Sequence, residues 1–351
     1  MQTYFSRLVS GEEQYAYEAI RQALEQKTAF AEVRCDETSV QVYEAVNMDN
    51  PFFALSHPVM QCVYDGRSFA FQYIECDEEK FFSRLGGMEE KIRKRYHTQG
   101  DLSAYALYLA IYDEITQTVK YDEEGFRAYL NLQRHSDDML ARETFLRRYG
   151  DSFSPYGALV NKKAVCNGIA KLFQILCERF SLPCVCVQAR TVVEKDPPDE
   201  ISNDSQCDHL LNVVEVDGAL AFVDVTNGLP NEGFPFTRYD YFMVNYEVLK
   251  KVMLLRSCDL QSFPCNGPRN MYYERNKLSF TSVGKLSRFL AGYISKFSGG
   301  QVRFSYEGTM SDKKLTDLCS DILTAHCPPL KQICGTDCNQ GFGNFAVVDR
   351  K

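Results

Sequence analysis

A cysteine, a histidine and an aspartate occur in this 351-residue chain where together they could carry out nucleophilic chemistry. Cys166 precedes an apolar helical pattern, His209 begins a strand-like run, and Asp224 interrupts another apolar run. A thiol becomes a strong nucleophile when a base removes its proton, and a histidine can hold that proton as imidazolium. A carboxylate on the other ring nitrogen fixes the tautomer and orientation of the imidazole. The three residue types therefore predict acyl transfer through a thioester.

The stretch that follows Cys166 predicts a helix over residues 166–180. Its apolar residues recur at helical spacing and form one stripe, which consists of Ile169, Leu172, Phe173, Leu176 and Phe180. Pro183 follows closely and favours an end of the helix before it. Unpaired N–H groups and the helix dipole at the N-terminus favour the thiolate of Cys166 over the thiol.

The spacing of His209 and Asp224 allows contact across a β-hairpin. If Asp217-Gly218 is a two-residue turn, counting outward places His209 opposite Thr226. Asp224 then lies on the same face as His209, as a diagonal neighbour about 7–8 Å away at the backbone. A three-residue turn would move the carboxylate to the opposite face.

Each of the three residues also has an ordinary structural interpretation. A cysteine among fourteen is usually a core thiol, a single histidine is usually a hydrogen-bonded core residue, and Asp224 could cap a strand end. A carboxylate in the apolar run 221–226 is nevertheless costly to bury unless it is paired or hydrogen-bonded. The joint occurrence of all three favours the functional interpretation.

The motifs around these residues resemble those of the transglutaminase-like superfamily, a branch of the papain-like cysteine enzymes. Tyr156–Val160 leads into Val165–Ala170, which contains the Cys-x-Gly-x-Ala pattern. The histidine motif is His209–Asn212, and the acid lies in Val223–Thr226. The order of cysteine, histidine and aspartate matches the triad of the family. Over residues 100–250 these motifs are specific for the fold and the triad, and they carry little information about the substrate.

The wider layout resembles that of multi-domain bacterial transglutaminase-like proteins, which also have a tail with a Tyr-Tyr run, here Tyr272-Tyr273. The resemblance implies an α+β fold in which a helix packs on an antiparallel sheet in a papain-like core. It implies Cys166, His209 and Asp224 as catalytic residues. Weaker candidates for contacts with the substrate or the oxyanion are Tyr156, Asn167 and Asn212, beside the backbone N–H of Cys166 as the default donor.

The chain departs from the family pattern at three positions. Leu211 and Asn227 stand where the family often has tryptophan, and Asn167 stands where it often has glutamate. We expect these differences to change the wall of the cleft and to leave the triad unaffected.

The element pattern predicts three parts: an α+β module over residues 1–88, the core over 89–256, and a second α+β module over 257–351. For the first module it predicts a helix over 10–26, capped by Ser10 with Glu13, and strands over 40–46, 59–64 and 68–74. The hairpin signal Asp65-Gly66-Arg67 joins the last two strands.

The remaining elements follow the same reasoning. In the core we expect helices over 102–119, 126–133 and 139–149 and strands over 184–189, 209–216, 219–226 and 241–244. In the last part we expect strands over 271–280, 301–304 and 342–348 and helices over 283–297 and 313–326. The acidic segment 194–208 precedes His209 directly and is either a lid over the cleft or a solvated connector.

The composition excludes several classes of function. The net charge of −8 argues against nucleic acid as the main partner and against an anionic membrane surface. No apolar run reaches the ~18 residues of a membrane span, and charged residues interrupt any signal sequence near the start. We therefore expect a cytoplasmic protein without a membrane span, and the sequence carries no signal for an oligomeric state.

The fourteen cysteines are expected to be free thiols, many of them in the core. The last four, Cys319, Cys327, Cys334 and Cys338, lack the CxxC spacing of zinc sites. No oxygen-rich loop for calcium is evident either. We expect neither a metal nor a cofactor.

Two functions remain open at this point. One is a cysteine peptidase, amidase or transglutaminase that acts on a protein or peptide substrate. The other is a catalytically weak binding or scaffold protein that keeps the fold, which the missing tryptophans and the two flanking modules motivate.

Overall fold

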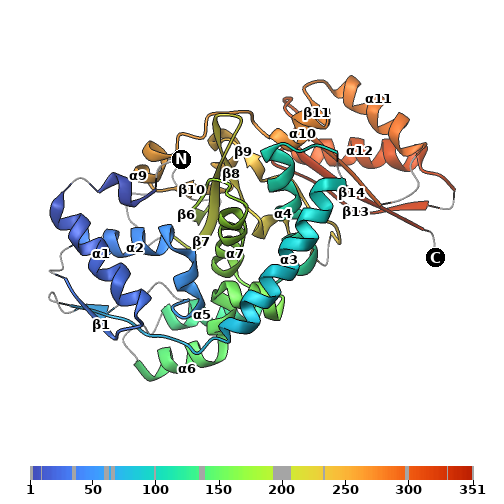
Figure 1. Ribbon diagram of the computed structural model, residues 1–351. Coiled ribbons are helices and arrows are strands. Elements are labelled where there is room, and N and C mark those ends of the chain that lie inside the picture. The colour runs from blue at the N-terminus through green and yellow to red at the C-terminus, as the bar shows by residue number, and fades with distance from the viewer. Residues whose placement is uncertain are drawn as a thin grey trace.

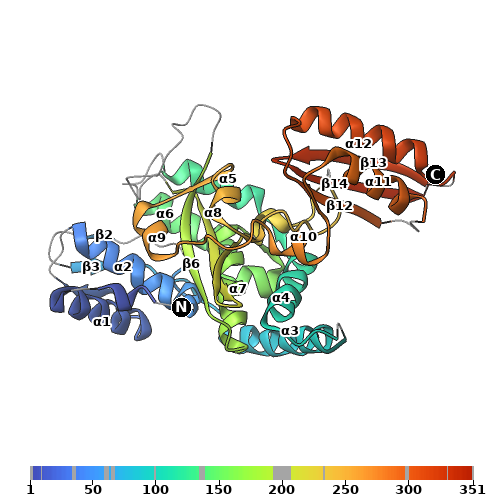
Figure 2. The ribbon, with the colours of Figure 1, turned by 90° about the horizontal axis from the view of Figure 1, so that it is seen from above.

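The computed structural model describes residues 3–8, 10–33, 37–58, 63–64, 68–98, 100–133, 139–192, 207–231, 234–296, 300–329 and 331–349. The fold is mixed α+β, as the sequence predicts. A central sheet with helices on it lies between an N-terminal group of elements on one side and a C-terminal sheet with two helices on the other (Figures 1 and 2).

The central sheet has five antiparallel strands in the order β10-β6-β7-β8-β9. They are β6 Cys184–Thr191, β7 His209–Val216, β8 Ala219–Val223, β9 Phe242–Val244 and β10 Met253–Leu255. Strands β6, β7, β8 and β9 were predicted and are confirmed, although β8 ends at Val223 rather than at Thr226. The short strand β10 was not predicted.

Helix α7, Cys166–Arg179, packs on β7, as predicted. The stripe residues Ile169, Leu172, Phe173 and Leu176 are fully buried, and Phe180 follows the helix as its C-cap. Helix α4, Ala104–Thr118, covers α7 and begins after Ser103, whose hydroxyl accepts a hydrogen bond from the N–H of Ala106. Helix α3, Glu78–Thr98, packs on α4 and runs through the expected boundary at residue 88.

The N-terminal elements are α1 Gly11–Glu25, β1 Phe30–Glu32, α2 Glu37–Asp49, β2 Val63–Tyr64 and β3 Ser68–Ala70. The capping box of Ser10 and Glu13 is present. β2 and β3 pair antiparallel as predicted, over fewer residues, and the predicted turn 65–67 lies outside the described residues. The predicted strand 40–46 is wrong: this segment belongs to α2, whose buried Val42, Tyr43 and Val46 repeat at helical spacing.

The C-terminal sheet has the order β11-β12-β14-β13. Its elements are β11 Ser279–Phe280, α11 Val283–Ile294, β12 Gly300–Tyr306, α12 Asp312–His326, β13 Lys331–Asn339 and β14 Phe342–Asp349. Strand β13 was not predicted. The predicted strand 271–280 is wrong. Asn270 caps the short helix α10 Met271–Arg275, and only Ser279 and Phe280 of the predicted strand are extended, as β11.

The shorter elements complete the core. They are β4 Lys120–Tyr121, α5 Glu123–Gln133, α6 Met139–Tyr149, β5 Lys163–Ala164, α8 Tyr246–Leu249 and α9 Ser257–Ser262. The helices α5 and α6 confirm the predictions over 126–133 and 139–149. A π-helical turn, Gly157–Asn161, leads into β5 just before α7.

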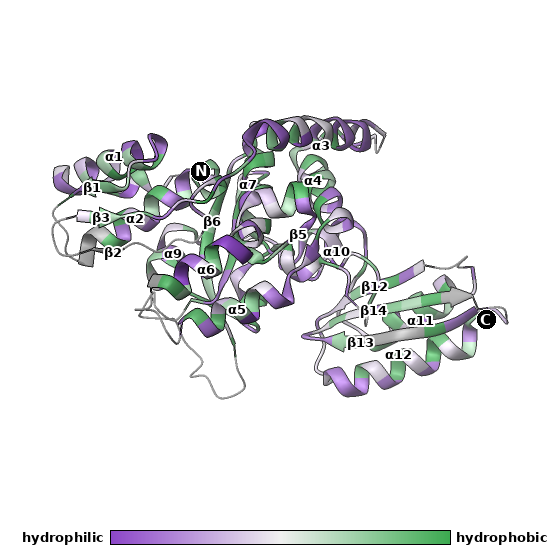
Figure 3. Cartoon of the chain, turned by 90° about the horizontal axis from the view of Figure 1, so that it is seen from below, coloured by the Kyte–Doolittle hydropathy of each residue, from purple (hydrophilic) through white to green (hydrophobic). Residues whose placement is uncertain are grey.

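Apolar residues gather in distinct clusters. One joins the N-terminal elements to β6 and β7, a second holds α3, α4 and α7 on the sheet, and a third lies within the C-terminal sheet and its two helices. In Figure 3 the outward face of α3 is hydrophilic, whereas β6 at the centre is hydrophobic. Among the described residues no helix is both long and apolar enough to cross a membrane.

Candidate active site

Cys166 is the first residue of α7, and the structure holds this helix start tightly. Val165, the N-cap, is buried with Phe145 and Phe153, and its N–H donates to the carbonyl of Ser152. A Cβ on Gly168 would lie 2.5 Å from the Ser154 carbonyl oxygen, so glycine lets the helix approach this turn closely. The Cys166 side chain is thereby fixed in place, with 7% of the residue exposed.

The β7–β8 hairpin has the predicted register. Val216 pairs with Ala219, and the ladder continues to Asn212 opposite Val223. Asp217 and Gly218 both have positive φ, as a type I′ turn requires. Thr226 does not pair with His209, because the chain leaves the sheet after Val223 and turns.

Asp224 follows the end of β8 directly and is fully buried. Its Oδ2 lies 3.0 Å from Nε2 of His209, the contact that the hairpin register predicted. Asn227 donates twice to the same carboxylate, from its backbone N–H to Oδ1 at 3.1 Å and from its Nδ2 to Oδ2 at 2.8 Å. Burial alone would raise the pKa of Asp224, but His209 and these hydrogen bonds lower it below its ordinary value.

His209 lies between the carboxylate of Asp224 and the thiol of Cys166. Burial alone would lower its pKa, but the charge of Asp224, the charge of Cys166 and hydrogen bonds to both hold the pKa well above the ordinary value. Since Nε2 faces Asp224, Nδ1 is the ring nitrogen that can take the proton of the thiol. The arrangement therefore favours the imidazolium form of His209 next to the Cys166 sulfur.

The three weaker candidates do not join this group as oxyanion donors. Asn212 is fully buried, and its Nδ2 donates to the Ala170 carbonyl in the core. Asn167 donates from Nδ2 to the carbonyls of Pro58 and Phe153, at 2.7 and 2.6 Å. Its amide therefore connects the start of α7 to these two segments.

Tyr156 lies elsewhere. The charged groups that affect its hydroxyl, beyond burial, are Asp77, Asp151 and Cys76, and these together raise its pKa. None of them belongs to the Cys166–His209–Asp224 group.

The tyrosine at this group is Tyr121, which sequence reasoning missed. Tyr121 pairs with Ala164 across the short parallel strands β4 and β5, two residues before Cys166. Burial raises the pKa of its hydroxyl well above the ordinary value, and nearby Cys166 and Glu123 raise it further. No local sequence motif predicts this position of Tyr121, because pairing between β4 and β5, which lie far apart in the sequence, brings it to the site.

Asn227 was also missed as a part of the group. The sequence predicted that this departure from the family pattern changes only the wall of the cleft. That expectation is wrong, since the Asn227 amide contacts the buried carboxylate of Asp224.

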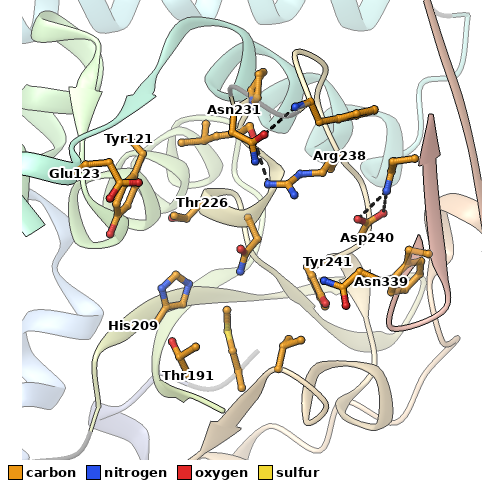
Figure 4. Close-up of a pocket in the computed structure, with 18 of the residues that line it drawn as sticks. Tyr121, Glu123, Thr191, His209, Thr226, Asn231, Arg238, Asp240, Tyr241 and Asn339 are labelled. Atoms are coloured by element: carbon orange, nitrogen blue, oxygen red, sulfur yellow. Dashed lines mark hydrogen bonds between the residues drawn. The ribbon is translucent and has the colours of Figure 1, made fainter. Parts of the chain in front are cut away.

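A cleft of 730 Å³ opens beside His209 (Figure 4). Tyr121 and Glu123 lie on one side of it, and Tyr241 and Asn339 on the other. The C-terminal sheet contributes three lining residues, which are Asn339, Phe342 and Asn344. Cys166 is not among the lining residues, so the cleft reaches the group from the imidazole side.

Two further expectations concern the surroundings of the cleft. Most of the acidic segment 194–208 lies outside the described residues, and its last residue, Asp208, lines the cleft. In the part of the chain that the structure describes, no three His, Cys, Asp or Glu side chains are grouped as metal ligands would be.

Comparison with known proteins gives little to add to this geometry. No family model and no curated protein matches the sequence. One solved structure that matches is described as "Crystal structure of a TGase", with 13% identity and a TM-score of 0.27 over 55% of this chain. The chain spans about half of that structure, 48% of its length. A likeness at this level carries no argument, so the functional proposal rests on the site itself.

Proposed function

We propose that the protein is a cysteine-dependent acyl-transfer enzyme of transglutaminase-like type, with Cys166 as nucleophile, His209 as acid and base, and Asp224 as the residue that orients His209. The observation that carries the proposal is the position of the His209 imidazole, whose Nε2 lies 3.0 Å from the Asp224 carboxylate. Cys166 is near enough to the same ring to raise its pKa. The substrate is a carboxamide or peptide bond of a protein or peptide.

In the first step the Cys166 thiolate attacks the carbonyl carbon, and a C–S bond forms. The C–N bond then breaks while the imidazolium of His209 gives its proton to the leaving amine. The Cys166 backbone N–H, the first of α7 and unpaired within the helix, is the donor that we assign to the oxyanion.

In the second step water attacks the thioester and passes a proton to His209, and the C–S bond breaks with the Cys166 thiolate as the leaving group. The products are a carboxylic acid and the restored cysteine, so the enzyme is an amidase or peptidase. An amine in place of water gives a new amide, which makes the enzyme a transglutaminase. The acceptor is therefore the part of the proposal that a product assay has to decide.

The test of the nucleophile is alkylation by iodoacetamide at neutral pH, read at each cysteine by mass spectrometry. Cys166 should react faster than Cys258, an exposed cysteine, and His209→Gln should abolish this advantage. Cys258→Ala is the matched control and should leave the fast phase intact, whereas Cys166→Ala should remove it. A Cys166 that reacts no faster than Cys258 would overturn the proposal.

The second candidate is a binding protein that keeps the fold and has little activity. The low exposure of Cys166, and its absence from the cleft lining, favour this candidate. It predicts slow alkylation of Cys166 in the folded protein and fast alkylation after denaturation, so the same experiment separates the two.

A further inference from the structure

Arg238 places a positive charge in the cleft, and no carboxylate of the described residues forms an ion pair with it. Its side chain lines the cleft, and its Nε is buried without a hydrogen-bond partner among the described residues. Its Nη2 makes one long contact, 3.5 Å from the carbonyl oxygen of Leu229. A guanidinium with free donors in a partly buried cleft is costly unless an anion completes its hydrogen bonds.

The backbone of Arg238 is held firmly, so the guanidinium has a defined place. Its N–H donates to the carbonyl of Gly228 at 3.0 Å, and its carbonyl accepts from the Tyr112 hydroxyl at 2.6 Å. A Cβ on Gly228 would overlap the hydroxyl of Tyr112 on α4. Glycine at this position therefore lets the segment around Gly228 pack closely against α4. The backbone position of Arg238 is therefore fixed without a ligand.

The carboxylates that line the cleft do not form ion pairs with Arg238 in the described structure. Asp240 accepts hydrogen bonds from the Tyr273 hydroxyl and the Asn344 amide, at 2.7 and 3.0 Å. Asp208 accepts from the backbone N–H of Thr191 at 2.8 Å. Glu123 lies across the cleft from Arg238, beside Tyr121 (Figure 4).

We propose that Arg238 forms an anion subsite of the cleft that binds a carboxylate of the substrate, at a distance from the bond that Cys166 attacks. This proposal rests on the proposed function and names the substrate class: amides or peptides that carry a carboxylate beyond the scissile bond. The planar guanidinium offers parallel N–H donors that match a carboxylate. The surrounding carboxylates make the cleft a poorer site for a doubly charged phosphate than for a singly charged carboxylate.

The test is a series of chloroacetyl amides with linkers of increasing length that end in a carboxylate or, in the matched compound, in a primary amide. Each compound alkylates Cys166, and the acid-to-amide ratio of second-order rate constants isolates the effect of the charge. At one linker length the ratio in the wild type should reach about tenfold, which corresponds to the free energy of one charge-assisted hydrogen bond between the guanidinium and the carboxylate. Arg238→Gln should bring this ratio to about one, and Arg238→Lys should keep part of it.

Arg288→Gln on the exposed face of α11 is the control, because it changes the net charge equally and lies outside the cleft lining. A ratio near one at every length in the wild type, or a preference that survives in Arg238→Gln, would overturn the subsite. A phosphonate of the best length that reacts faster than the carboxylate would overturn the carboxylate class.

A second arm separates the subsite from the reaction. The unreactive acetyl analogue of the best acid is titrated into Cys166→Ala, with and without Arg238→Gln, and binding is followed by NMR. Weaker binding in the double variant, by about tenfold, supports the subsite even if Cys166 is unreactive in the wild type. Equal binding of the acid and the amide to Cys166→Ala would reject the subsite and leave the triad to the alkylation experiment.

Discussion

At the scale of single residues, the buried carboxylate of Asp224 is the feature on which the site depends. It has three hydrogen bonds within the group, one with His209 and two with Asn227. A carboxylate so buried stays ionised only while these partners remain. We therefore propose that Asn227 is a positioning residue, which acts on His209 through Asp224.

The first prediction concerns this role of Asn227. Asn227→Ala removes the side-chain hydrogen bond that lowers the pKa of Asp224, so that pKa should rise. The acid limb of the pH profile for Cys166 alkylation should then move to higher pH, and the maximal rate should fall about tenfold. Asn231→Ala, at another asparagine of the cleft, is the control and should leave the profile in place. A lower rate with an unmoved profile would mean that Asn227 supports the loop only.

The second prediction concerns stability and pH. The folded pKa of His209 is raised, so its contribution is complete below the unfolded value of about 6.5 and is lost as the pH rises through the folded pKa. The folded pKa of Asp224 is lowered, so its contribution is present above about 3.9 and is lost as the pH falls. Urea unfolding of wild type and His209→Gln should differ most at about pH 5.5 and less at about pH 9. A difference independent of pH would contradict the imidazolium–carboxylate pair.

The sequence alone predicted the His209–Asp224 contact, because a hairpin turn of known length sets which residues share a face. The same reasoning could not find Tyr121, which reaches Cys166 through pairing between distant strands. It also assigned Tyr156 and Asn212 to the site from the motif alone, although their surroundings are the loop near Asp151 and the core. Motif position specifies the backbone more reliably than the direction of a side chain.

At the scale of elements, the start of α7 depends on how closely the helix approaches the turn before it. Gly168→Ala adds a Cβ that meets a backbone carbonyl at 2.5 Å, which cannot move aside cheaply. We expect this substitution to destabilise the protein by about 1–3 kcal/mol, as overpacking does, and to slow alkylation of Cys166 by displacing the helix start. Urea unfolding and the alkylation rate measure the two effects.

Gly87→Ala in α3 is the matched control. It is also a glycine within a helix, and nothing lies within 4 Å of the added Cβ. It should be neutral or should stabilise the protein by about 0.5–1 kcal/mol. Equal losses in both variants would show that helix propensity, and not the close approach at Gly168, determines the result.

The wrong element predictions share one physical reason. Residues 40–46 contain valines and a tyrosine, and residues 271–280 contain tyrosines and a phenylalanine, all of which favour strands, yet both segments contain helix. In α2 the buried positions Val42, Tyr43 and Val46 follow the helical period and pack beside α1. In α10 the Asn270 side chain accepts from the N–H of Tyr273 and begins a turn. Packing and capping outweighed the intrinsic preference of the residues.

At the scale of the whole molecule, we propose that the C-terminal sheet and its two helices fold as a part of their own, since they have a separate apolar cluster. The N-terminal elements share their apolar cluster with β6 and β7, so they do not form such a part. The contacts that join the C-terminal part to the core include Phe342 of β14, which belongs to the apolar cluster of β6 and β7, and a group of polar and aromatic side chains. Tyr239 and Tyr272 stack at 3.9 Å, and the guanidinium of Arg303 lies 4.6 Å from the Tyr239 ring. Arg303 also donates to the Tyr272 hydroxyl at 3.0 Å. The sequence showed the tyrosines but not the arginine that meets them from β12.

The last prediction follows from this junction. Arg303→Met keeps the length of the side chain but removes the cation–π contact and the hydrogen bond to Tyr272. The loss should be about 2 kcal/mol, which corresponds to roughly 30-fold faster amide exchange where the C-terminal part meets the core. The affected amides should be those of β12, of β14 and around Tyr239, whereas the apolar cluster with Leu290 should protect α11 as before.

The same substitution should reach the cleft, because Asn344 of β14 contacts Asp240, the neighbour of Tyr241. The carbonyl of Tyr241 accepts a hydrogen bond from the backbone N–H of Asp224. Weaker packing at the junction should therefore reach Asp224 through Asp240 and Tyr241. Arg288→Met on the exposed face of α11 is the control and should change neither exchange at the junction nor alkylation of Cys166. Faster exchange throughout α11 and α12 in Arg303→Met would mean that the C-terminal part unfolds and does not merely separate. A changed junction with an unchanged alkylation rate would show that the C-terminal sheet lines the cleft without supporting the triad.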